Sequence, residues 1–205
     1  FFSNVVIPSY ILNSCKIFNA EMVHIGSGCI YQGGIGDGYL ETDAPNYDGS
    51  YYSWTKVVSE RFLSNHNVLQ LRVRMPLGNK PDPRNLITKL LGYKKVVIAA
   101  NSITYIPDLL FTARRLIEQN KKGIYNVVNE GSVLHSDILE TYSIVSGQNL
   151  AYECVSVKEL DSMTKAPRSN CVLSTKKLRE EGLSMRPARL VIKDCIKEYI
   201  SGGSV

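Results

Sequence analysis

The sequence lacks the patterns that mark several classes of protein. Lys and Arg never occur in runs longer than two, and the formal net charge is only +5, so nucleic acid is not an expected partner. No apolar stretch reaches the roughly 18 residues that cross a bilayer. The first apolar stretch, Val5–Leu12, is interrupted by Pro8 and lacks the basic start of a signal peptide. A membrane partner is therefore not expected either.

The number and spacing of the cysteines argue against two kinds of site. The chain has five Cys, an odd number, and none forms a CxxC pair. This argues against a disulfide framework and against a zinc site, and it indicates a reducing compartment. The sequence therefore predicts a cytoplasmic protein without a bound metal.

Two further absences concern organisation. There are no internal repeats or low-complexity tracts, and no GxxGxxG or GxGxxG fingerprint follows a strand near the start. The Gly-rich run 33–38 comes after the candidate site residues described below and lies in a loop, residues 31–49, rich in Gly, Asp, Asn and Pro. What remains is a composition of 44% hydrophobic and 21% charged residues over 205 positions, typical of a globular protein of one domain or of two lobes.

Apolar periodicity predicts alternating strands and helices. We expect strands at 21–25, 68–73, 95–98, 124–128 and 151–155, and helices at 3–18, 50–66, 84–91, 107–120, 136–146, 157–163, 174–181 and 188–200. This alternation predicts an α/β fold with a Rossmann-like parallel sheet. Such sheets bind ligands at the carboxyl ends of their strands, where Ser27 and Cys29 follow one strand and Arg74 and Pro76 follow another.

Tyr52 and Lys56 stand four residues apart in a predicted helix, so the two side chains share one face. A nearby ammonium favours phenolate, and Ser27 could offer a hydroxyl to the same reacting oxygen. Together the three would exchange a proton with a carbonyl and alcohol pair. YxxxK alone is a weak signal, because chance produces such a pair in a chain of this composition and an ordinary amphipathic helix explains it equally well.

The motifs together resemble the extended short-chain dehydrogenase/reductase family. In that family a Ser or Thr stands four residues before an aromatic residue, as Ser27 and Tyr31 do, and YxxxK follows. Further segments resemble the nucleotide-rhamnose synthase subgroup, the UDP-4-keto-6-deoxyglucose 3,5-epimerase/4-reductases, which are related to dTDP-4-dehydrorhamnose reductase and GDP-fucose synthase. These segments are Gly28–Tyr31, Arg72–Pro76, Pro83–Lys89, Gly123–Asn126 with His135, and Ala166–Asn170.

The resemblance implies a 4-keto-sugar reductase that uses NADPH or NADH. Tyr52 would protonate the C4 oxygen, Ser27 would hydrogen-bond that oxygen, and Lys56 would hold the nicotinamide ribose and lower the pKa of Tyr52. Asn4 matches the fourth member of the family's proton relay. Arg74 and Pro76, at the end of the neighbouring strand, are expected on the cofactor side.

The resemblance also implies epimerisation at C3 and C5. Cys29, two residues after Ser27, and Lys89 match the pair of acid/base groups of the bifunctional relatives. A thiol, and a lysine whose pKa is depressed by partial burial, suit this chemistry. Read without the resemblance, Cys29 is a small buried residue at a strand end and Lys89 a solvated helix lysine.

Further residues are expected at the nucleotide-diphosphate sugar. Asn85 matches a position that contacts the diphosphate, although a simple helix cap explains it too. Arg168, like Arg74, could bind an anionic group, because Arg pairs with phosphate in a fork geometry, or could form a structural ion pair. His135 is expected only to start a helix.

The resemblance finally predicts how the chain is organised. Residues 1–76 would be the C-terminal half of a Rossmann-type catalytic domain. Residues 77–205 would hold its remaining elements and a small substrate-binding lobe. Upstream strands that cradle the cofactor would precede this chain. A homodimer is expected through helices 3–18 and 50–66. Two other functions stay open: a reductase without epimerase activity, and a non-catalytic regulatory subunit of the same fold.

Overall fold

The computed structural model describes residues 1–34, 36–164 and 166–202. Parts of the expected loop 31–49 and of the expected region 77–205 therefore lie outside the described residues. The helices are α1 Ile7–Ile17, α2 Tyr51–Ser64, α3 Leu86–Leu91, α4 Ile106–Glu118, α5 His135–Ser146, α6 Val157–Met163, α7 Lys176–Glu180 and α8 Ala188–Ile200. The strands are β1 Met22–Ser27, β2 Val68–Val73, β3 Pro76–Leu77, β4 Lys95–Val97, β5 Thr104–Tyr105, β6 Gly123–Asn126 and β7 Glu153–Val155.

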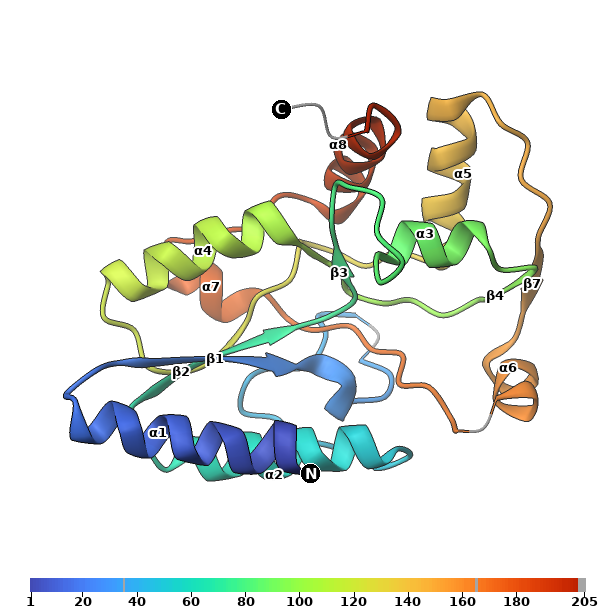
Figure 1. Cartoon of the computed structure of the whole chain (residues 1–205). Coiled ribbons are helices and arrows are strands. Elements are labelled where there is room, and N and C mark those ends of the chain that lie inside the picture. The colour runs from blue at the N-terminus through green and yellow to red at the C-terminus, as the bar shows by residue number, and fades with distance from the viewer. Residues whose placement is uncertain (35, 165, 203–205) are drawn as a thin grey trace.

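A parallel sheet in the order β1–β2–β6 forms the base of the molecule. All six residues of β2 are buried, as expected for a strand covered on both faces and paired along both edges. Figure 1 shows α1 and α2 on one side of this sheet and α4 and α7 on the other. The α/β fold with a Rossmann-like parallel sheet is thereby confirmed.

The core differs on the two faces of the sheet. Leu12 of α1 and Leu63 of α2 pack with Met22 and Val68 on one face. On the other face, two leucines from α4 and α7 join residues of β2 and β6 in a second cluster: Leu116, Leu178, Leu69, Leu71 and Tyr125. Because β1 and β2 end beside each other, with Ser27 opposite Val73, the residues that follow them meet at one edge.

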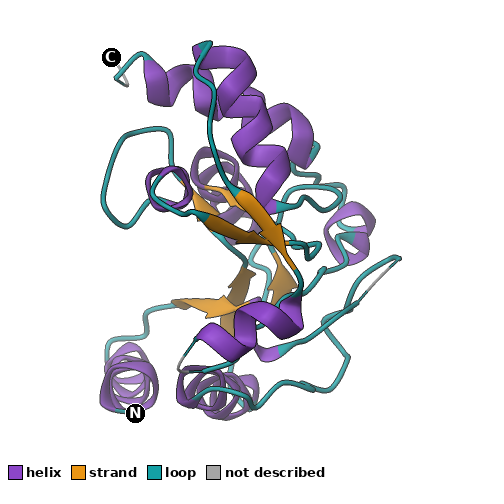
Figure 2. Cartoon of the chain, turned by 90° about the vertical axis from the view of Figure 1, so that its right-hand side faces the viewer, coloured by secondary structure: helices purple, strands orange, loops and turns teal. Residues whose placement is uncertain are grey.

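A second lobe lies beyond that edge. It contains α3, α5 and α8, which share the largest buried apolar cluster, with β4 and β7 paired alongside. Figure 2 shows these helices stacked at the opposite end of the molecule from α1 and α2. Since β6 returns to the first sheet, the elements after residue 76 contribute to both parts. The division at residue 76 stays a prediction.

The loop 31–49 has no helix in its described part, as predicted, but it is tied down along its length. Gly33 and Tyr39 form isolated bridges with Cys171 and Leu173. Arg72 of β2 donates hydrogen bonds to two carbonyls of the loop, those of Leu40 and Glu41. The loop therefore lies alongside the segment 169–175 and is held against the end of β2.

Some elements differ from the predictions. The expected helix 3–18 divides into a π-helical turn, Phe2–Val6, and α1. The two-residue strands β3 and β5 were not predicted, because so short a run carries no periodicity; they form only by pairing with each other. Within the described residues, no helix is long and apolar enough to cross a membrane.

Candidate active site

A cavity of about 710 Å³ opens where β1 and β2 end, between the sheet and the second lobe. Four cationic side chains line it, from Arg74, Lys89, Lys95 and Arg168. None of the lining residues that the structure describes is an Asp or Glu. The cavity is therefore positive in character and suits an anionic molecule.

Tyr52 enters the cavity from the first turn of α2. This helix begins where the Ser50 hydroxyl accepts a hydrogen bond of 3.1 Å from the amide of Ser53, a standard N-cap. A hydrogen bond with the Ser27 side chain lowers the pKa of Tyr52. Ser27 ends β1 and is buried. The structure thus brings the predicted serine and tyrosine together.

The expected acidity of Tyr52 is not found. Burial raises its pKa above the ordinary value, outweighing the effect of Ser27, and Lys56 makes no contribution to it. The Lys56 ammonium lies 5.8 Å from the centre of the Tyr52 ring. Burial also lowers the pKa of Lys56 itself. In this arrangement the ammonium faces the ring and both groups are partly desolvated, so the effect of Lys56 on this phenol stays a prediction.

Asn4 is connected to Tyr52 through the helix backbone. Its Nδ2 donates to Thr55 Oγ1 at 3.0 Å, and that hydroxyl donates to the carbonyl oxygen of Tyr52 at 2.7 Å. Asn4 lies in the π-helical turn, a feature frequent at functional sites. It does not line the cavity, so a direct role in proton transfer stays a prediction.

Cys29 lies in a short turn, Gly28–Ile30, that follows β1 directly. The amide of Cys29 donates to Ser27 Oγ at 3.1 Å, which fixes the turn. A Cβ on Gly28 would come within 2.7 Å of Leu173 Cδ1, so a larger residue here would require that leucine side chain to shift. The sulfur of Cys29 reaches the cavity beside Tyr52.

Arg74 lies at the cavity wall, and its expected role on the cofactor side stays a prediction. Its Nη1 lies 2.8 Å from the sulfur of Cys29. Its Nε and Nη2 donate to Asn101 Oδ1 at 3.2 and 2.6 Å, and Nη2 also donates to the carbonyl of Ser169. Most of the guanidinium is therefore engaged by protein groups at the cavity wall.

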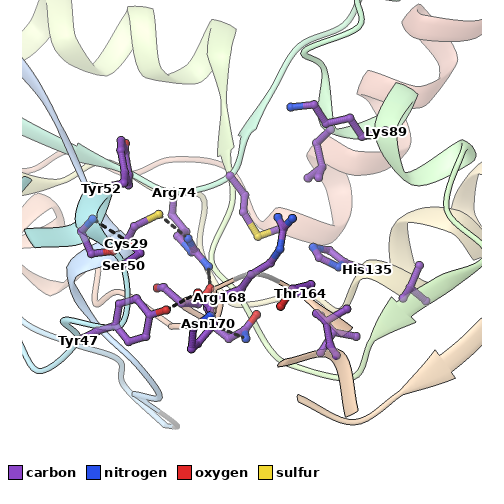
Figure 3. A pocket seen from close by; sticks show the side chains of 18 of the residues that line it. Cys29, Tyr47, Ser50, Tyr52, Arg74, Lys89, His135, Thr164, Arg168 and Asn170 are labelled. Atoms are coloured by element: carbon purple, nitrogen blue, oxygen red, sulfur yellow. Dashed lines mark hydrogen bonds between the residues drawn. The ribbon is translucent and has the colours of Figure 1, made fainter. Parts of the chain in front are cut away.

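Lys89 and Arg168 both line the cavity. Figure 3 shows Lys89 on the side opposite Cys29, as its proposed role requires. The expected partial burial of Lys89 is wrong, because its place on the outer face of α3 leaves it exposed. Arg168 is exposed as well, and its positive charge contributes to lowering the pKa of His135.

Asn85 and Pro76 do not line the cavity. The side chain of Asn85 caps α3 by accepting from the amide of Ile87, and it donates to the carbonyls of Gly78 and Lys80. These bonds engage its polar atoms, so the helix cap is present, and contact with a diphosphate stays a prediction. Pro76 is exposed at the start of β3.

Several lining residues were not predicted. His135 starts α5, as expected, but it also faces the cavity (Figure 3). Burial, with Arg74 and Arg168, lowers its pKa to about 4. Tyr47 donates to the carbonyl of Pro167 at 2.6 Å across the cavity mouth. Only folding brings these distant segments together, and no local pattern marks them; the one available signal was the resemblance around His135.

Comparison with known proteins agrees with this geometry. No protein-family model matches the chain. It is 34% identical over 206 residues to the bifunctional dTDP-4-dehydrorhamnose 3,5-epimerase/dTDP-4-dehydrorhamnose reductase of Arabidopsis thaliana, covering 97% of this chain and 67% of that protein. It is 35% identical to a trifunctional UDP-glucose 4,6-dehydratase/UDP-4-keto-6-deoxy-D-glucose 3,5-epimerase/UDP-4-keto-L-rhamnose-reductase of the same plant, covering 98% of this chain but 30% of that protein.

Solved structures show the same similarity. The UDP-rhamnose synthase of Acanthamoeba polyphaga mimivirus superposes with a TM-score of 0.89 at 29% identity, over 95% of this chain and 70% of that one. The dTDP-4-dehydrorhamnose reductase of Bacillus anthracis, solved with NADP, shares the fold with a TM-score of 0.79 at 20% identity, over 97% and 70% of the two chains. The chain belongs to the dTDP-4-dehydrorhamnose reductase and UDP-rhamnose synthase family of extended short-chain dehydrogenase/reductases.

Proposed function

We propose that the protein is a nucleotide-sugar 3,5-epimerase/4-reductase that converts a UDP-4-keto-6-deoxy-hexose to UDP-L-rhamnose with NADPH. The observation that carries the proposal is that Tyr52 and Cys29 line one cationic cavity, while the buried Ser27 hydrogen-bonds Tyr52 beside it. A proton donor for a ketone oxygen and a group that can remove a proton from the neighbouring carbon then face the same ligand.

The residues present fit the nicotinamide half of the cofactor. Lys56 has no hydrogen bond or ion pair within the described ranges, although it is half-buried. Its ammonium is thus free for ribose hydroxyls. When bound, NADPH would supply the hydride. Tyr52 would donate its proton to the C4 oxygen, and Ser27 would hydrogen-bond that oxygen.

The epimerase step would use the two walls of the cavity. Cys29 would remove a proton from the carbon beside the ketone, leaving an enolate whose charge rests on the C4 oxygen. Lys89, on the opposite side, would deliver a proton to the other face of that carbon. One proton leaves and one returns, so the centre is inverted with no net change in composition.

The substrate's diphosphate would lie among the cationic side chains. Arg168 offers a fork suited to phosphate. Lys95 also lines the cavity but forms ion pairs with Glu153 and Glu159. We therefore assign the anionic contact to Arg168 rather than to Asn85, which is occupied as a helix cap.

Substitution of Tyr52 tests the reductase. Tyr52→Phe removes the proton donor but keeps the ring, and it should lower NADPH oxidation on a 4-keto-6-deoxy sugar by on the order of 10²–10⁴-fold in the full-length protein. Tyr51→Phe, one position earlier on an exposed side chain, is the matched control and should leave the rate unchanged. Unchanged oxidation in Tyr52→Phe would favour a non-catalytic regulatory subunit instead.

A reductase without epimerase activity is the second candidate, favoured by the exposure of Lys89. Exchange of solvent deuterium into C3 and C5 separates the two. Cys29→Ser should abolish this exchange while reduction of an already epimerised 4-keto sugar continues. Undiminished exchange would remove Cys29 from the epimerase role.

We also propose a homodimer that pairs through the faces of α1 and α2. These helices and the residue that follows α1 expose large apolar side chains, among them Tyr10, Ile17, Phe18 and Trp54. An exposed apolar patch of this kind is typical of an interface. Light scattering on Phe18→Asp/Trp54→Asp should give half the wild-type mass; an unchanged mass would exclude this interface.

A cytoplasmic location is proposed from the cysteines. All five are free thiols, including the exposed Cys154, which suits a reducing compartment. Cell fractionation of the tagged protein tests this location.

A further inference from the structure

Arg72 in β2 and Arg74 just after it differ in their partners: one pairs with a carboxylate and the other does not. Arg72 forms a two-pronged ion pair with Glu60. Arg74, two residues later and 6% exposed, forms no ion pair with any Asp or Glu in the part of the chain that the structure describes. Its hydrogen bonds go to neutral acceptors, the Asn101 amide and the Ser169 carbonyl.

A buried charge without a counterion is costly. The group next to Arg74 that can carry a negative charge is the thiol of Cys29, 2.8 Å from Nη1 (Figure 3). A neighbouring guanidinium favours thiolate over thiol, and the thiolate is the reactive form of cysteine. Arg74 is therefore a buried cation in direct contact with the sulfur of Cys29 at the cavity wall.

Several buried contacts fix the orientation of Arg74. Asn101 is fully buried, and its Oδ1 accepts from Arg74 and from the amide of Cys171. The backbone amide of Arg74 donates to the buried Thr104 hydroxyl at 3.0 Å. These contacts leave the guanidinium little freedom to swing into the cavity toward a ligand.

We propose that Arg74 is a positioning residue that holds the Cys29 sulfur at the cavity wall and sets its reactivity. The role of that sulfur in removing a substrate proton rests on the proposed epimerase function. The reactivity of Cys29 does not, because it can be measured without sugar or cofactor.

The other charged and titratable groups around Cys29 are Lys56, Tyr47, Tyr52 and Cys171, each of which interacts electrostatically with it. Lys56 would also favour the anion. Arg74 is distinguished from it by direct contact with the sulfur and by a charge that no accessible pH removes.

Alkylation with iodoacetamide at about pH 7, followed by mass spectrometry of the Cys29 peptide, measures the reactivity of the Cys29 sulfur. Arg74→Met keeps the length but removes the charge, and it should slow alkylation of Cys29 by on the order of tenfold. Arg74→Lys keeps the charge and should slow it less. Arg114→Met, on the exposed face of α4, is the matched control, and the exposed Cys154 is the internal reference in every sample.

A second variant keeps the test decisive if Arg74→Met does not fold. Asn101→Asp gives Arg74 a carboxylate partner at the same position, so it should also slow alkylation of Cys29. Wild-type or faster alkylation in the folded Arg74→Met or Asn101→Asp protein would overturn the proposal.

Solvent deuterium exchange at C3 and C5 links the Cys29 sulfur to epimerisation. Arg74→Met alone should slow this exchange while reduction of an already epimerised 4-keto sugar continues, because Arg74 acts through the sulfur. Loss of that reduction as well would show instead that Arg74 touches the substrate. Wild-type protein that never exchanges deuterium would defeat the epimerase function alone, since the alkylation result would still stand.

Discussion

Arg72 and Glu60 form a bidentate ion pair inside the protein, with Nε–Oε2 at 2.7 Å and Nη2–Oε1 at 2.8 Å. Their side chains are only 2% and 9% exposed. The pair joins the central strand β2 to α2, the helix that carries Tyr52 and Lys56. It therefore helps to place the candidate catalytic tyrosine relative to the strand ends.

Breaking this pair should destabilise the fold. Glu60→Gln leaves the buried Arg72 charge without its counterion and should lower the free energy of unfolding by about 3–5 kcal/mol. Glu118→Gln, which removes an exposed partner of Arg114 on α4, is the control and should change it by less than ~1 kcal/mol. Urea denaturation measures both, and equal losses would contradict the structural role of the pair.

Stability should decline as the pH falls through the weakly acidic range. The pKa of His135 is lowered to about 4 by burial, Arg74 and Arg168, and that of His24 to about 4 by burial and Lys56. Because the ordinary value is near 6.5, the unfolded state binds these protons first. The free energy of unfolding should be fully present above about pH 6.5 and fall towards about pH 4.

The double variant His24→Gln/His135→Gln isolates this effect. Urea denaturation at about pH 7 and about pH 4.5 should show a smaller difference for the double variant than for the wild type, because two sources of proton uptake on unfolding are gone. Equal differences would mean that other groups govern acid stability.

Gly38, in the loop 31–49, must be a glycine because its backbone lies very close to another segment. Gly38 has φ +75°, and a Cβ there would lie 2.7 Å from the carbonyl carbon of Leu173 and 2.8 Å from the amide of Ser174. Gly38→Ala must strain the backbone and also push the segment 169–175 away. Gly147 ends α5 with φ +71° and would meet no atom within 4 Å.

Gly147→Ala is thus a matched control that reports the backbone strain alone. It should cost about 1–2 kcal/mol of unfolding free energy, and Gly38→Ala should exceed it by a further ~1–3 kcal/mol from overpacking. Thermal denaturation of both variants tests the difference. Similar losses would show that the segment 169–175 yields easily.

Asn4 and Thr55 should act on stability as one unit. Asn4→Ala and Thr55→Val each remove the same hydrogen bond, so each should lower the free energy of unfolding by about 1 kcal/mol. The double variant should lose less than the sum of the two single losses. Additive losses in a double-mutant cycle would mean that the contact contributes nothing.

Strands and helices with long apolar patterns were predictable. The strand Val68–Val73 and the helices 157–163 and 188–200 have the expected bounds, because their side-chain periodicity is a local property. That Cys29 and Arg74 lie at one edge of the sheet was also predictable, since parallel strands bring their carboxyl ends together.

The partner of each polar side chain was not predictable. The sequence made Arg74 a candidate for an anionic group or a structural ion pair, and Asn85 a candidate for a diphosphate contact or a helix cap. Only folding shows that the Cys29 thiol lies beside Arg74 and that Asn85 caps α3. The sequence also predicted an acidic Tyr52, although burial raises the pKa of that phenol. Desolvation and contact distances depend on what packs around a group, so a linear pattern does not contain them.

The sequence by itself therefore determined the alternation of elements, the parallel sheet and the family-specific order of Ser27, Cys29, Tyr52 and Lys56. Only the tertiary structure decided that His135 and Tyr47 face the same cavity and that β3 pairs with β5. The reason is physical. Periodicity reports which side of an element is buried, whereas a site is made by side chains far apart in the chain, whose meeting depends on how the elements pack.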